Sequence, residues 1–175
     1  MSSYKERNEN FVEYICRQCS SDKGIAAHLR RADLESSDPL VLQTLVRFGL
    51  DITKNIEFIP FCLVTAAIAR EKKHEIGSDS FIQLLASIEK SSTDKGEKND
   101  SRFRRILACE NLNELALIFR PLMSFVQSRI NCAIDYKELL DDLCSFGFED
   151  GRLRVKKKWA MQFYKAHKEN KQVEE

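Results

Sequence analysis

Apolar residues recur at the spacing of an α-helix along almost the whole chain, and this pattern restricts the fold more than any other feature of the sequence. Phe11, Val12, Ile15 and Cys19, for example, share one helical face. No segment alternates apolar and polar residues as a half-buried strand does, and no internal repeat is present. Only 6 Gly and 3 Pro occur, which suits helices joined by short turns. The sequence therefore predicts an all-α fold of eight or nine helices.

Capping and breaking residues divide this pattern into elements. Asp38-Pro39 is a helix start, and Phe48-Gly49 is a helix end with Gly in the left-handed position. Asn111-x-x-Glu114 and Asp135-x-x-Glu138 are capping boxes. Pro60 fits only the first turn of its helix, and Pro121 marks a kink or a boundary. The predicted helices cover residues 11–19, 25–31, 39–48, 58–73, 81–88, 102–109, 115–128, 136–146 and 152–168.

The length of 175 residues fits one domain. Residues 89–101 contain no apolar side chain and are rich in Lys, Ser, Asp and Gly, which is typical of an exposed, mobile loop. We therefore predict a single helical domain over 1–168, with an N-terminal half (1–88), this loop and a C-terminal half (102–168). Residues 169–175 form a polar tail.

The uncharged run from Phe58 to Ala69 is the most apolar segment, and it predicts the most buried helix. It is shorter than the roughly 20 residues that cross a bilayer. The N-terminus, Met-Ser-Ser-Tyr-Lys-Glu-Arg, is not followed by the apolar core of a secretory signal. We expect a cytoplasmic protein without membrane contact, whose 6 Cys are reduced thiols.

Catalytic motifs are weakly represented, so we expect no enzyme, metal or cofactor. His28, His74 and His167 have no metal-ligand spacing, and no phosphate-binding glycine loop or nucleophile elbow occurs. Cys16-x-x-Cys19 has zinc-like spacing, but it lies within an amphipathic helix and lacks a second pair. The Phe residues within apolar runs are interpreted as core and not as platforms for bases, namely Phe48, Phe58, Phe61, Phe81, Phe119, Phe125 and Phe146.

Charge is distributed unevenly along the sequence. The formal net charge is +1, but residues 151–168 hold seven basic residues and no acidic one, which leaves −6 on the remainder. A nearly neutral protein with one strongly basic element suggests a single polyanion-binding surface.

The last helix separates its charged and apolar residues by face. At 100° per residue, Arg154, Lys158, Lys165 and Lys168 form a stripe, whereas Val155, Trp159, Phe163 and Ala166 fall on another face. The helix can therefore dock through Trp159 and Phe163 and present a cationic ridge, to which Lys157 is added, to a phosphate backbone. A merely solvated basic face is the alternative.

Basic residues elsewhere add to this ridge. Arg30 and Arg31 end the second helix, and Arg102, Arg104 and Arg105 open the helix after the loop. Arg120 lies among apolar neighbours, so it either pairs with an acid or is presented from a rigid helix. No aromatic residues alternate with these cations, which favours contact with the nucleic-acid backbone over base reading.

The chain resembles the CasB family, the small subunit of the type I-E CRISPR complex called Cascade, over roughly residues 11–164. The resemblance rests on a series of short motifs in order. They are Ala27-His-Leu-Arg-Arg-Ala32, Val46-Arg-Phe-Gly49, Phe61-Cys-Leu-Val-Thr-Ala66, Phe81-Ile-Gln-Leu-Leu-Ala86, Asn99-Asp-Ser-Arg-Phe-Arg-Arg-Ile-Leu107, Leu115-Ala-Leu-Ile-Phe-Arg-Pro-Leu122, Leu139-Leu-Asp-Asp-Leu143 and Arg154-Val-Lys-Lys-Lys-Trp-Ala-Met-Gln-Phe163.

The resemblance implies an all-helical, non-enzymatic subunit, present as two copies in a ribonucleoprotein with the other Cascade subunits and CRISPR RNA. It implies binding of the displaced single-stranded DNA through a basic surface. The family's basic positions correspond to Arg30, Arg31, Arg102, Arg120 and Arg154, with Lys54 as a looser match. Arg105, Lys157, Lys158 and Lys165 come from the charge pattern of their helices alone. The alternative function is a helical protein–protein adaptor with no nucleic-acid role.

Overall fold

The computed structural model describes residues 2–35, 37–91 and 100–169, and these residues form nine helices and no sheet. The predicted all-α fold is confirmed. The helices are α1 (Ser2–Ser21), α2 (Lys23–Leu29), α3 (Pro39–Arg47), α4 (Asn55–Arg70), α5 (Phe81–Ser91), α6 (Ser101–Ala108), α7 (Leu112–Arg129), α8 (Tyr136–Phe146) and α9 (Glu149–Glu169).

The helix caps that the sequence predicts are present. Asp38 stands immediately before Pro39, and its side chain accepts a hydrogen bond from the Leu40 N–H. Gly49, after the end of α3, has the left-handed φ of 70°. Asn111 accepts from the Glu114 N–H at the start of α7, and Asp135 does the same from Glu138 at the start of α8. Each cap satisfies one of the N–H groups that a helix start leaves without an intrahelical partner.

Several predicted boundaries differ from the observed ones. α1 begins at Ser2 instead of residue 11, and α4 ends at Arg70 instead of residue 73. α4 begins at Asn55 instead of residue 58, so Pro60 lies in its second turn. Glu57 does not interrupt this helix because its carboxylate accepts the Asp51 N–H at 3.1 Å, beside the helix start. α7 continues through Pro121 without a boundary, and α9 begins at Glu149, three residues before the predicted Arg152.

The predicted exposed loop begins too early. α5 continues to Ser91, and Glu89 is only 3% exposed. An ion pair of 3.6 Å between the Glu89 carboxylate and Arg102 explains how a charged residue is tolerated there. Residues 92–99 of the predicted loop and 170–175 of the predicted tail lie outside the described residues.

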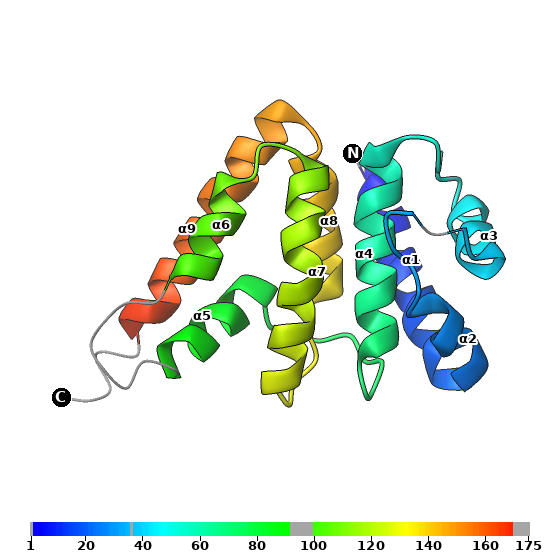
Figure 1. Cartoon of the computed structure of the whole chain (residues 1–175), viewed down its shortest axis with the longest axis horizontal. Helices are drawn as coiled ribbons and strands as arrows, with labels where there is room; N and C mark the ends of the chain where they lie inside the picture. Colours follow the sequence, from blue (N-terminus) through cyan, green and yellow to red (C-terminus); the bar gives the residue numbers. More distant parts are fainter. Residues whose placement is uncertain (1, 36, 92–99, 170–175) are drawn as a thin grey trace.

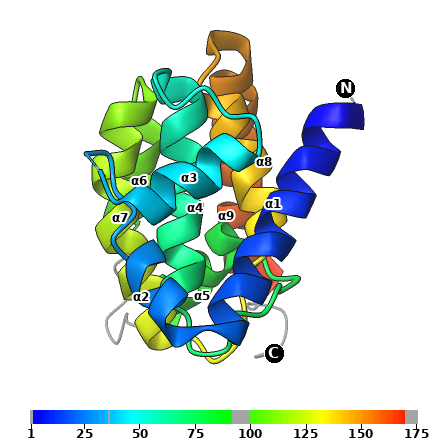
Figure 2. The same cartoon turned by 90° about the vertical axis from the view of Figure 1, so that its right-hand side faces the viewer.

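α4 is the central helix of the fold. It packs against α1, α2, α3, α7 and α8 (Figure 1). All of its residues from Phe58 to Ala69 are buried, as the uncharged run predicts. Figure 2 shows α3 crossing this helix, with α1 and α2 on the same side of the molecule. Two C-terminal carbonyls of α4 accept side-chain hydrogen bonds, from Arg30 at Ala69 and from Gln127 at Ala67, both at 2.7 Å.

The C-terminal helices pack around α9 and α7. α9 contacts α5 and α8, and α6 contacts α7 (Figure 1). α5 belongs by sequence to the predicted N-terminal half, yet it packs against α9 and α7. The division of the chain into halves remains a prediction. The seven Phe assigned to the core all belong to one cluster of apolar side chains, with Phe48 and Phe125 partly buried at its edge.

Candidate nucleic-acid interface

The docking face of α9 is the one that the sequence predicts. Val155, Trp159 and Phe163 are buried. Phe163 stacks on Phe103 of α6 with 4.1 Å between ring centroids. A buried apolar contact of this kind holds α9 in one orientation, and it therefore determines where the basic residues of the helix point.

The outer side of α9 presents Arg154, Lys157 and Lys165, all of which are exposed. None of the three makes a side-chain hydrogen bond or ion pair with another residue of the described ranges. Their charges are therefore available to an external anion. The side chain of Lys168, the last cation of the predicted stripe, lies outside the described side chains.

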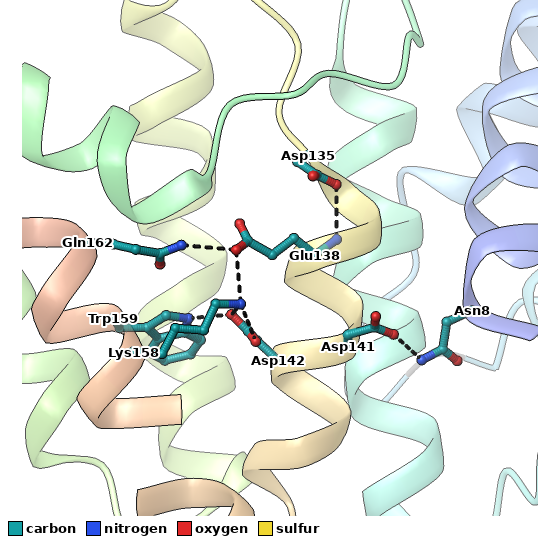
Figure 3. A network of polar contacts seen from close by, with 8 residues as sticks. All are labelled: Asn8, Asp135, Glu138, Asp141, Asp142, Lys158, Trp159 and Gln162. Carbon is teal, nitrogen blue, oxygen red and sulfur yellow. Dashed lines mark hydrogen bonds and ion pairs between the residues drawn. The ribbon is translucent and has the colours of Figure 1, made fainter. Parts of the chain in front are cut away.

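Lys158 does not extend this ridge, so the prediction of a solvent-facing stripe was wrong at this position. Its amine lies 2.7 Å from Asp142 Oδ1 and 2.9 Å from Glu138 Oε1, both on α8 (Figure 3). Trp159 Nε1–H donates to the second Asp142 oxygen at 2.8 Å, and Gln162 donates to Glu138 at 2.9 Å. The Lys158 side chain is 38% exposed and acts as a link between the two helices.

Burial and pairing act against each other in this network. Burial raises the pKa of Asp142, although the Lys158 amine and the Trp159 N–H oppose the shift. Burial also disfavours the charged Lys158, but its hydrogen bonds to Asp142 and Glu138 outweigh that effect and raise the pKa of the amine. Lys158 is therefore charged at neutral pH, and its charge is compensated within the fold.

The cations of α6 lie beside α7. The Arg102 guanidinium lies over the Phe125 ring, 4.4 Å from its centroid, and Arg129 lies 5.2 Å from the same centroid. Arg105 is exposed one turn along α6. Arg129 is absent from the binding residues predicted from the sequence. It follows Phe125 by one turn of α7, and this spacing could have indicated that the two side chains lie together. Arg102, Arg105 and Phe125 line a groove of about 160 Å³ with Ile118, Pro121 and Leu122, called the α6–α7 groove below.

Arg120 faces the other side of Pro121. Its guanidinium lies 3.4 Å from Asp33, yet 47% of its side chain stays exposed, so pairing and presentation occur together. Burial lowers the pKa of Arg70, and the positive charge of Arg120 adds to the shift, which places two guanidiniums near one carboxylate. Arg70 is a second cation that the sequence-based selection missed. These side chains border a separate groove of about 240 Å³, the Arg120 groove, whose lining includes Asp33, Glu35, Leu63, Arg70, Leu117, Arg120, Pro121 and Met123.

Arg30 and Arg31 lie near this second groove. Arg30 Nε donates to Ala69 O at 2.7 Å, and Arg70 donates to Arg30 O at 3.1 Å. Arg30 therefore joins the ends of α2 and α4, and Arg31 beside it is exposed. Arg30 and Arg31 are therefore grouped with Arg70 and Arg120 near the Arg120 groove.

Lys54 stands apart from the other predicted cations. It precedes α4 and pairs with Asp51 at 3.0 Å, and the two side chains are 62% and 41% exposed, respectively. The hydrogen bond to Asp51 raises the pKa of the Lys54 amine. No contact within the described ranges links Lys54 to another predicted binding residue.

The cysteine pair on α1 is packed into the core. Cys16 and Cys19 are buried, and burial raises their pKa values to about 12 and about 11, respectively. Thiols of this kind are poor sources of the thiolate that metal binding and redox chemistry need. Among the described residues, His, Cys, Asp and Glu side chains form no group of three placed to hold a metal ion.

None of the helices in the described part of the chain combines the length and apolar character needed to cross a membrane.

Comparisons with known proteins give one family match and two similar folds. The model of the family described as CRISPR-associated protein Cse2 matches residues 26–164. The crystal structure of CasB from M. ruber is similar, with a TM-score of 0.75, 23% identity, and coverage of 95% of this chain and 97% of that one. The crystal structure of CasB from Thermobifida fusca gives a TM-score of 0.65, 20% identity, and coverage of 90% and 97%. A search of curated proteins found no match.

Proposed function

Because the chain belongs to the Cse2 family of CRISPR-associated proteins, also called CasB, the small subunit of type I-E Cascade, we propose that it holds single-stranded nucleic acid in that complex. In this proposal it is a non-catalytic, cytoplasmic subunit present as two copies. It stabilises the ribonucleoprotein through the other Cascade subunits and the CRISPR RNA backbone, and it binds the displaced DNA strand.

The observation that carries the proposal is a set of exposed cations on rigid helices. Arg102 and Arg105 lie on one side of Pro121 and Arg120 lies on the other, because Pro121 borders both grooves. The outer side of α9 contributes three further exposed cations, Arg154, Lys157 and Lys165. Guanidinium and ammonium groups presented in this way attract phosphates without reading bases. Opening an R-loop is a nearly balanced exchange, so contacts to the displaced strand can favour it.

Removal of two unpaired cations should weaken DNA binding without loss of the fold. Arg105→Ala combined with Arg154→Ala deletes two exposed guanidiniums that form no side-chain hydrogen bond or ion pair with another described residue. Arg102 is kept because its charge neutralises buried Glu89. Fluorescence anisotropy of a labelled single strand of about 12 nucleotides across a salt series measures the effect. We expect the slope of log K against log salt to fall by about 1.4, since each phosphate contact contributes about 0.7 on single strands.

The matched control removes the same charge from a distant helix. Lys5→Ala combined with Arg17→Ala acts on exposed residues of α1, which packs on α2, α4 and α8. This variant should keep the parental slope. Equal slopes for both double variants would mean that binding follows net charge alone, and the proposed surface would be wrong.

One observation favours the adaptor function instead. Leu153, Met161 and Tyr164 are exposed apolar residues on α9, and Met161 is 58% exposed. They share α9 with the exposed cations Arg154 and Lys157, and this mixture suits a protein partner that offers apolar and acidic side chains. If α9 serves only this purpose, Met161→Glu will abolish assembly with the other Cascade subunits and leave the anisotropy titration of the isolated protein unchanged.

A further inference from the structure

The α6–α7 groove combines apolar and cationic lining residues. Four residues of α7 and two arginines of α6 line it, and the two helices pack against each other (Figure 1). Its volume of about 160 Å³ is close to that of a cavity of about 150 Å³ that accepts a single benzene ring. The groove therefore has the size for one flat ring.

The positive charge of the groove indicates a ring that is attached to an anionic group. No carboxylate lines the α6–α7 groove, whereas Asp33 and Glu35 line the Arg120 groove. A phosphodiester next to the bound ring would thus meet Arg102 and Arg105 without an acidic neighbour among the lining residues. The Arg102 guanidinium is held in place by the Phe125 ring on one side and by buried Glu89. A guanidinium held in this way is positioned in advance for a phosphate.

We propose that the α6–α7 groove binds one nucleobase of the single strand, with the adjoining phosphate on Arg102 and Arg105. The base lies against Ile118 and Pro121, and it is held by its flat face, so any base is accepted. This inference rests on the proposed function, and it adds a fixed point to a surface that otherwise attracts phosphates only through their charge.

The test compares two strands of equal charge. One is an oligothymidine of about 12 nucleotides, and the other has the same backbone length with abasic sites throughout. Anisotropy with the full-length protein should give about tenfold tighter binding of the strand that carries bases, as stacking of one base provides. Both strands should show the same salt dependence, because both present the same phosphates.

A groove-filling variant locates the effect. Ile118→Phe places extra bulk in the groove and should reduce the affinity for oligothymidine to that for the abasic strand, which itself should not change. Leu117→Phe is the matched control, because Leu117 is the preceding residue on α7, is exposed and lines the other groove. It should leave both affinities at their parental values.

The outcomes separate this inference from the proposed function. Equal binding of both strands by the parental protein would overturn the base site and leave the phosphate-binding surface intact. If Ile118→Phe weakens both strands equally, or weakens only assembly with the other subunits, the groove holds a phosphate or a protein side chain, and the inference is wrong. Failure of the parental protein to bind either strand would remove the proposed function and the inference together.

Discussion

Lys158→Met should destabilise the protein by about 2 kcal/mol at pH 7, while Lys157→Met should change stability by less than about 0.5 kcal/mol. The two lysines are neighbours in sequence, but only Lys158 contacts Asp142 and Glu138. Removal of its amine leaves the 8% exposed Asp142 carboxylate without a cation. The expected loss is smaller than the roughly 3–5 kcal/mol of a fully buried pair, because the Lys158 side chain is 38% exposed. Urea unfolding measures both variants.

The same two variants should also differ in nucleic-acid binding, where only Lys157→Met should have an effect. Lys157→Met removes an exposed cation and should lower the salt slope of single-strand binding by about 0.7. Lys158→Met should leave that slope unchanged, because the charge of Lys158 is compensated by α8 (Figure 3). If Lys158→Met lowers the slope as much as Lys157→Met does, the Lys158 amine leaves the network to bind phosphate.

The cost of Lys158→Met should also shrink as the pH falls. Burial already raises the pKa of Asp142, and loss of the neighbouring amine raises it further. A carboxyl group whose pKa is higher in the folded state than in the unfolded state binds more protons when folded, so the folded state gains stability as the pH drops. Unfolding at about pH 4.5 should therefore show a smaller difference from the parental protein than at pH 7. A difference that grows on acidification would contradict this assignment.

Gly151→Ala should destabilise the protein by about 3 kcal/mol or more. A Cβ at this position would lie 2.0 Å from the Ser145 carbonyl oxygen, at the close crossing of α8 and α9. Because the obstacle is backbone, no side-chain rotation relieves it, and α9 must move away from α8. The shift acts on the docking of Trp159 and of the exposed cations together. Thermal unfolding and tryptophan fluorescence report stability and the Trp159 environment.

Gly49→Ala is the control for this substitution. Gly49 has a φ of 70°, and a Cβ there would meet no atom within 4 Å. Its cost is therefore the backbone strain of an L-residue in the left-handed region, about 1 kcal/mol. Equal destabilisation by the two variants would show that α8 and α9 tolerate the extra methyl group.

Local patterns predicted most of the fold. The caps at Asp38, Asn111 and Asp135 depend on residues two or three positions apart, so they can be identified before any tertiary structure is known. The errors occurred where a distant contact changed the outcome. Glu89 begins a segment with the composition of a loop, but the ion pair with Arg102 stabilises this residue in a buried helical turn.

The candidate site was less predictable than the fold. Sequence pattern identified the basic helices but not which cations are free. Arg70 and Arg129 were missed because their relation to Arg120 and Phe125 arises only when helices pack. Lys158 was included because the helical wheel places it near Arg154, and the wheel contains no information about α8.

The sequence by itself determined the helices, the buried α4 and the face of α9 that carries Trp159 and Phe163, because apolar periodicity and capping act over a few residues. Only the tertiary structure decided the use of each charge. Lys158 meets Asp142 across 16 residues, and Arg120 meets Asp33 across 87. Charges interact according to their distance in space and their exposure to water, and packing of the helices determines both quantities.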